Sequence, residues 1–123
     1  MNEANRCIKN LLRLICLLQE NSENICQNND CTRPFLGPGL NNICYNTRVI
    51  TLYNKNGELF TAAYIDNTTE QTSSFFKVVS INDNTATLLI LSENDGIFSS
   101  TNNYITINIC CICAIRCITD TLI

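Results

Sequence analysis

Histidine is absent from this sequence, and so is any cluster of positive charge. A nucleophilic cysteine needs a base or a cationic environment to hold its thiolate, and only Arg116 lies close in sequence to any dense group of cysteines. The eight lysines and arginines are scattered singly in a chain of net charge −3, which leaves no footprint for a phosphate backbone. These absences argue against an enzyme and against a nucleic-acid partner.

Long apolar runs are also missing. No stretch approaches the ~20 apolar residues of a membrane span. Near the start of the chain the longest apolar run, Leu14 to Leu18, is too short for the core of a secretion signal. We therefore expect no membrane span and synthesis in a cytosol, where stable disulfides are rare. Nine cysteines in such a protein require an explanation.

Four of the nine cysteines, Cys110, Cys111, Cys113 and Cys117, lie within eight residues. A β-strand over residues 105–117 would place Cys111, Cys113 and Cys117 on one face and Cys110 on the other. The first half of this segment alternates between apolar and polar residues, whereas the second half is apolar on both sides. The pattern predicts a strand that passes from a half-solvated position into a packed core or a contact with another chain.

This cluster has three interpretations: a metal site, a catalytic thiol and a set of crosslinks. The spacing C-C-x-C-x-x-x-C is not that of structural zinc sites or of iron–sulfur sites. Along a strand, Cys111 and Cys113 have Cα atoms about 6.8 Å apart, at the far limit of disulfide geometry, so each should bond to another strand or molecule. We expect no cofactor, no metal ligand and no catalytic residue. A small metal-binding or thiol-redox protein is the alternative.

Residues 1–20 have the pattern of an amphipathic helix that begins at Asn2. Its apolar stripe consists of Cys7, Ile8, Leu11, Leu14, Ile15 and Leu18. Because Cys7 lies in that stripe, we expect its thiol to be buried and inert. Cys16 and Leu17 lie on the opposite, polar side. Their exposure is either ordinary or the mark of a face that meets another subunit.

Residues 21–46 are rich in asparagine and contain both prolines, so they indicate a loop. This loop carries Cys26, Cys31 and Cys44. A local disulfide such as Cys26 to Cys31 and a bond to another chain are equally compatible with the spacing. Because nine is an odd number, at least one cysteine of the chain is left for an intermolecular bond or a free thiol.

Residues 47–118 indicate an antiparallel β core. Residues 47–53 and 58–65 flank a turn at Asn54 to Gly57, and residues 75–81 and 86–91 form a second pair about Asn82 to Asn84. Residues 94–96 and 99–103 should be loops. The chain is thus predicted to be one domain, 1–123, that is mainly β, an antiparallel sandwich or barrel-like fold with one N-terminal helix.

Several segments resemble the CotY/CotZ/ExsY family of cysteine-rich spore coat and exosporium proteins. They are Pro34 to Gly37, Asn46 to Arg48 with Ile50 to Tyr53, Phe76 to Ile81, and Ile105 to Ile109 leading into the C-x-C-A-I-R-C ending of Cys111 to Cys117. That ending is the most specific part. This chain departs from the family in being short, in lacking a histidine-bearing tail and in adding Cys110 beside the motif.

The resemblance implies a structural protein that assembles with itself and with other spore coat proteins. It would be made in the mother-cell cytosol and become oxidised at the spore surface, in the coat or exosporium, after the mother cell lyses. The implied product is a disulfide-linked two-dimensional layer, a protective shell that limits permeability and is built from rings of subunits.

The crosslink candidates are Cys16, Cys26, Cys31, Cys44, Cys110, Cys111, Cys113 and Cys117. Because the cysteines sit towards the two ends of the chain, we expect bonds between residues 16–31 of one subunit and residues 110–117 of another.

Overall fold

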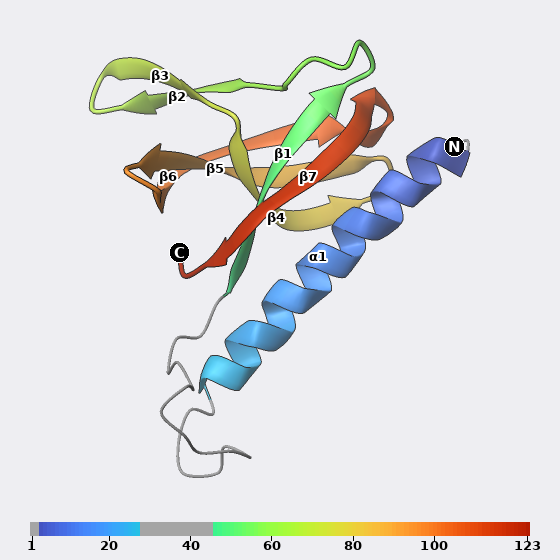
Figure 1. Ribbon diagram of the computed structural model, residues 1–123, viewed down its shortest axis with the longest axis horizontal. Helices are drawn as coiled ribbons and strands as arrows, with labels where there is room; N and C mark the ends of the chain where they lie inside the picture. Colours follow the sequence, from blue (N-terminus) through green and yellow to red (C-terminus); the bar gives the residue numbers. More distant parts are fainter. Residues whose placement is uncertain (1–2, 28–45) are drawn as a thin grey trace.

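The computed structural model describes residues 3–27 and 46–123, which form one long helix and seven β-strands (Figure 1). In chain order the elements are α1 (Glu3–Gln27), β1 (Thr47–Asn54), β2 (Ala62–Asp66), β3 (Thr69–Ser73), β4 (Phe75–Asn82), β5 (Thr85–Asn94), β6 (Ile97–Asn108), the short 3₁₀ helix η1 (Ile109–Cys111) and β7 (Ile112–Thr121). The mainly β fold with an N-terminal helix is confirmed.

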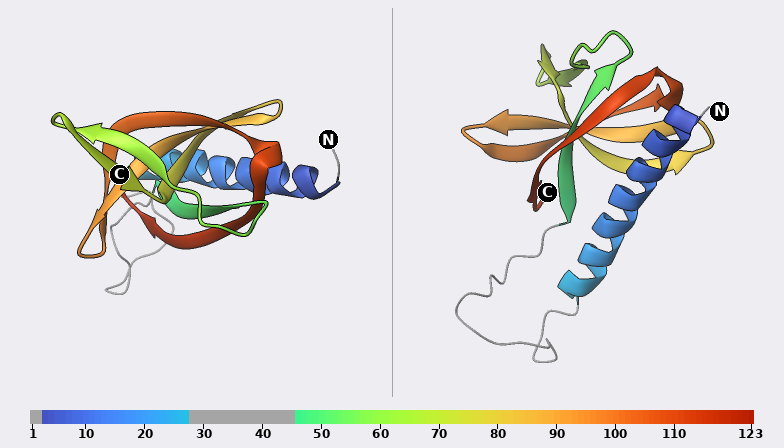
Figure 2. Two further views of the ribbon diagram at one scale, coloured as in Figure 1. Left: turned by 90° about the horizontal axis from the view of Figure 1, so that it is seen from above. Right: turned by 45° about the vertical axis from the view of Figure 1, so that its right-hand side comes forward.

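Five strands form one antiparallel sheet in the order β6-β5-β4-β1-β7, and β2 pairs only with β3. Although β6 and β7 follow each other through η1, they lie at opposite edges of the sheet. The sheet curls, so that from above β6, η1 and β7 trace an arc over α1 (Figure 2, left). The described strands do not close into a barrel, because no ladder joins β6 to β7.

The first predicted hairpin forms its turn but not its second strand. Gly57 has φ of +79°, and its N–H donates to the Asn54 carbonyl at 2.9 Å. Pairing then stops after a single bridge between Tyr53 and Leu59, and the chain leaves β1 to begin β2 at Ala62. The prediction of a long strand at residues 58–65 paired with β1 is therefore wrong.

The second predicted hairpin is confirmed as β4 and β5, with Asp83 in the left-handed region at φ 52°. Two other expectations are corrected. Residues 99–103, expected to be a loop, lie within β6, where Asn102 at φ 59° accompanies a shift in register. Strand β3 was not predicted, because its residues 69–73 are almost entirely polar and exposed.

Helix α1 runs to Gln27, beyond the predicted end at residue 20, and it packs on one side of the sheet (Figure 1). Its buried apolar side chains, Leu12 and Ile15, join a core with Ile50 of β1 and with Phe76 and Val78 of β4. The predicted apolar stripe is therefore only partly correct. Most of its members lie outside the core, namely Cys7, Leu11, Leu14 and Leu18.

Gln19 holds the helix against two strands at once. Its Nε2 donates to the Val78 carbonyl at 2.7 Å, and its Oε1 accepts from the Arg48 N–H at 3.0 Å. The side chain is 6% exposed; its hydrogen bond to the Val78 carbonyl is buried, and the one from the Arg48 N–H is partly buried. Because buried backbone groups must be paired, this amide sets the rotation of α1 relative to β1 and β4.

An ion pair joins β1 to the end of β7. Arg48 and Asp120 are directly opposite in the ladder, and the guanidinium donates through Nε to Oδ1 at 2.8 Å and through Nη2 to Oδ2 at 3.0 Å. The hydrogen bond from Arg48 lowers the pKa of Asp120 below its ordinary value. The same bond raises the pKa of Arg48.

Replacing Gln19 with leucine should lower the free energy of unfolding by about 2–4 kcal/mol, because one buried and one partly buried backbone group lose their partners. Chemical denaturation of reduced protein measures this change. The control is Gln71→Leu, since Gln71 is exposed on β3. Equal effects of the two substitutions would contradict a special role for Gln19.

Replacing Asp120 with asparagine should cost roughly 0.2–1 kcal/mol at neutral pH, as expected for a pair exposed to water. Since the folded-state pKa of Asp120 is depressed, its contribution is complete above 3.8 and disappears as the pH falls through the lower folded value. The difference between wild type and variant should therefore vanish in acid. Asp66→Asn, at an exposed carboxylate in β2, serves as the control. A difference that persists at pH 2 would argue against the ion pair as its source.

Candidate functional site

The cysteine-rich segment is not one strand, as the sequence suggested, but two strands separated by η1. Asn108 caps η1, its Oδ1 accepting from the Cys110 N–H at 2.9 Å. Ile109 is fully buried, and its N–H donates to the Asn84 carbonyl at 2.7 Å. This anchored turn sends the chain from one edge of the sheet to the other. The predicted alternation of thiols across residues 105–117 is therefore broken at Cys110 and Cys111.

Strand β7 presents its thiols at a sheet edge. It pairs with β1 on one side, and no strand of the described chain pairs with its other side. Cys113 and Cys117 are exposed, and Cys113 falls at an irregularity in the ladder between Tyr53 and Asn54. The two thiols are four strand residues apart, or about 13 Å, too far to bond to each other. The sequence predicted that the second half of residues 105–117 would lie in a packed core or against another chain. Within the described chain most of β7 is instead exposed.

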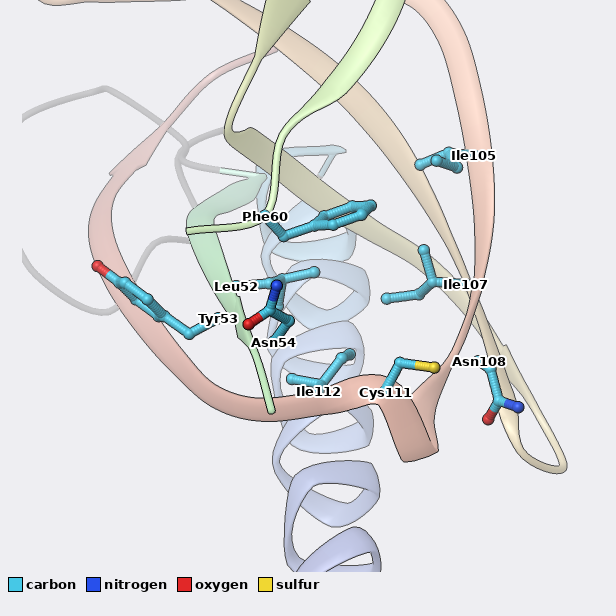
Figure 3. A pocket seen from close by; sticks show the side chains of 9 residues that line it. All are labelled: Leu52, Tyr53, Asn54, Phe60, Ile105, Ile107, Asn108, Cys111 and Ile112. Atoms are coloured by element: carbon cyan, nitrogen blue, oxygen red, sulfur yellow. The ribbon is translucent and has the colours of Figure 1, made fainter. Parts of the chain in front are cut away.

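Cys111 lies at the η1 end of an apolar cavity of about 390 Å³ between β6 and β1 (Figure 3). The other lining residues are Leu52, Tyr53, Asn54, Phe60, Ile105, Ile107, Asn108 and Ile112. Phe60 covers the cavity and stacks on Phe76 of the core, with ring centroids 5.6 Å apart. The thiol of Cys111 is exposed, so this sulfur lies beside an apolar hollow and remains open to water.

Two arginines lie close to the thiols of β7. The guanidinium of Arg116 lies over the Tyr53 ring, 5.9 Å from its centroid. Arg48 is held mainly by Asp120, and Cys117 contributes further to the raised pKa of this guanidinium. Arg48 and Arg116 therefore place positive charge along this part of the sheet edge.

The structure corrects the expectations for Cys7 and Cys16, the two cysteines of α1 whose side chains it describes. Cys7 is exposed rather than buried, because α1 is rotated so that Ile8, not Cys7, packs against the core. Cys16 is half-buried against the core rather than turned outward, and its Sγ lies 3.5 Å from the Val79 carbonyl oxygen. It lines a groove with Arg13 and Leu17.

Of the remaining cysteines in the N-terminal half, the structure describes the backbone of one. Cys26, predicted in a loop, lies within α1. Cys31 and Cys44 lie outside the described residues, so their predicted roles as crosslinks stay predictions.

The sequence analysis did not predict a second feature of α1, a group of leucines that are exposed along the helix. Their exposed fractions are 36% for Leu11, 53% for Leu14, 55% for Leu17 and 41% for Leu18. Only the outward position of Leu17 was predicted. The sequence does indicate these leucines, because its apolar stripe spans more of the helix circumference than packing against a single sheet requires.

Among the described residues, 3–27 and 46–123, no three Cys, Asp or Glu side chains converge as metal ligands would. No described helix is long and apolar enough to cross a membrane.

Comparison with known proteins identifies one family. The family model described as spore coat protein Z matches residues 1–97, which is most of the chain and ends before η1 and β7. No curated protein matches the chain. No solved structure matches it either. The chain therefore belongs to the spore coat protein Z family of structural proteins, which are located at the spore surface.

Proposed function

We propose that this coat protein is a self-assembling subunit whose copies form a disulfide-crosslinked two-dimensional layer, a protective shell that limits permeability at the spore surface. The observation that carries the proposal is the placement of thiols on η1 and on the unpaired edge of β7. Cys111, Cys113 and Cys117 are exposed there, and Cys110 is half-exposed. A thiol at an exposed edge can reach a neighbouring molecule, whereas a thiol in a core cannot.

Disulfide geometry supports bonds at this edge. Residues directly opposite each other on antiparallel strands have Cα atoms about 4.5–5.5 Å apart. A disulfide needs Cα atoms about 4.4–6.8 Å apart. A neighbour that places a cysteine opposite Cys113 or Cys117, along the free side of β7, can therefore bring the two sulfurs within bonding distance.

Each bond requires an oxidant, which fits a protein that leaves a reducing cytosol. Two thiols lose two protons and two electrons, and a new S–S bond forms; molecular oxygen accepts the electrons once the mother cell has lysed. The thiolate is the attacking form, and it reacts only where the sulfur is accessible, as it is at Cys113 and Cys117. Bonds would then form only after the subunits have met.

The partners on the neighbouring subunit are the N-terminal cysteines. We propose bonds from residues 110–117 of one copy to Cys26 or Cys31 of the next. Cys44 is a further candidate. Such a head-to-tail contact joins two different surfaces, so it can close into rings or continue as a layer, and it leaves surfaces free for other spore coat proteins.

Oxidised protein should migrate as a ladder in denaturing gels, and thiol should reduce the ladder to a monomer. Replacing Cys113 and Cys117 together with serine should shorten the ladder markedly, because the edge loses both of its strand thiols. Ala114→Ser is the control, because it changes an exposed residue of the same strand without removing a thiol, and it should leave the ladder unchanged. A clean monomer without reductant would contradict the crosslinked layer, and stoichiometric zinc or iron in reduced protein would favour a metal-binding function.

The layer should survive reduction but lose its resistance to heat. Disulfide geometry tolerates little misplacement, so non-covalent contacts must align the subunits before the bonds form. Electron microscopy of assemblies in reductant, before and after heating, tests this order of events. Dissolution into monomers under mild reduction would mean that the bonds themselves build the layer.

A further inference from the structure

The apolar cavity beside η1 exists because the curled sheet does not close. Ile105 and Ile107 reach it from β6 and Leu52 reaches it from β1, two strands that no ladder of the described sheet joins. Phe60 lies over the gap, and its N–H donates to the Leu52 carbonyl at 2.8 Å, so its backbone is fixed there. Ile112 lies at the end nearest to η1 (Figure 3). The walls of the cavity thus belong to segments that the fold itself holds in place.

The size and lining of this cavity suit a small organic molecule. Its volume of about 390 Å³ lies within the range of ligand pockets, which is about 300–1,000 Å³. An engineered apolar cavity of ~150 Å³ stays dry and binds benzene, so this larger one has room for a compound of two fused rings. None of its lining residues is charged. Because an unpaired charge is costly to bury, the occupant must be uncharged.

One polar group of the lining is fixed and has no partner. Asn54 Oδ1 accepts from the N–H groups of Asn56 at 2.9 Å and Glu58 at 3.0 Å, which determines how the amide is turned. In Figure 3 its Nδ2 points towards the side of Phe60, away from the turn. Among the described residues, none accepts a hydrogen bond from this Nδ2. The Tyr53 hydroxyl and the Asn108 amide are directed away from the other lining side chains (Figure 3).

We propose that this cavity is a binding site for an uncharged, largely hydrocarbon molecule that carries one hydrogen-bond acceptor, such as an aromatic ketone. The hydrocarbon part fills the space between β6 and Phe60, and the acceptor takes a hydrogen bond from Asn54 Nδ2. The bound molecule also lies against Cys111 and limits the access of oxidants to that thiol. Cys113 does not line the cavity and stays open. The site lies within one chain, so it does not depend on the crosslinked layer.

Equilibrium dialysis of the reduced full chain against three naphthalenes of similar size tests the ligand class. Acetylnaphthalene carries the acceptor, isopropylnaphthalene lacks it, and naphthoate carries a charge. The ketone should bind about two- to tenfold more tightly than the hydrocarbon, as expected for one hydrogen bond. The carboxylate should bind at least tenfold more weakly than the ketone. Equal binding of all three compounds, or no binding of the ketone, overturns the proposal.

Asn54→Asp keeps the oxygen that accepts from Asn56 and Glu58 but removes the donor. It should abolish the preference for the ketone over the hydrocarbon. The control is Asn94→Asp, which changes an exposed residue at the far end of the β5–β6 ladder from Asn108 and should keep the preference. Ile107→Trp should fill the cavity and weaken both uncharged compounds at least tenfold, with thermal unfolding showing that the variant is folded. An unchanged preference in Asn54→Asp contradicts the role of its amide.

Alkylation of wild type by iodoacetamide locates the bound molecule without any substitution. Saturating acetylnaphthalene should slow the alkylation of Cys111 at least threefold and leave Cys113 unchanged, as read from fragment ions in mass spectrometry. Cys113 is the internal control, because it is exposed and lies two residues away. Unchanged alkylation of Cys111 would place the compound elsewhere and overturn the proposal. Binding that weakens as the protein concentration rises would assign the cavity to a side chain of a neighbouring copy, which also overturns it.

Discussion

The rotation of α1 about its own axis determines which surfaces this protein offers, and Gln19 sets that rotation. One side-chain amide pairs with the Val78 carbonyl on β4 and with the Arg48 N–H on β1. Only one orientation of the helix satisfies both backbone groups, and in it Leu12 and Ile15 enter the core. The neighbouring leucines are left outside for the same reason. A polar residue at a buried position thus decides how an ambiguous apolar stripe is divided between the core and the surface.

The second constraint is the turn at η1. A buried Ile109 and the hydrogen bond to the Asn84 carbonyl hold this turn, and β6 and β7 consequently lie at opposite edges of the sheet. An exposed edge strand with free thiols risks uncontrolled pairing. Irregularities at Cys113 and next to Val49, together with Arg116, interrupt the regular edge of β7. These features disfavour strand addition by an arbitrary partner and still leave the sulfurs accessible.

In the layer that we propose, the two kinds of contact lie on separate elements. The exposed leucines of α1 supply apolar area that does not depend on redox conditions, whereas β7 and η1 supply bonds that form only with an oxidant. Such a division lets subunits align reversibly in the cytosol and become locked afterwards. The family match covers residues 1–97, which include α1, while the thiols of η1 and β7 follow it.

The sequence by itself determined the fold class, the β4–β5 hairpin, the turn at Gly57 and the family, because strand alternation, turn chemistry and short motifs are local properties. It did not determine where the thiols lie. The segment from Ile105 to Cys117 has the alternation of one strand, and only the packing of Ile109 breaks it. The predicted apolar stripe contained both residues that are buried and residues that are exposed, but the burial of Gln19 and the exposure of Leu14 and Cys7 depend on backbone groups contributed by β1 and β4. Those groups lie 29 and 59 residues away from Gln19, and only the tertiary structure brings them together.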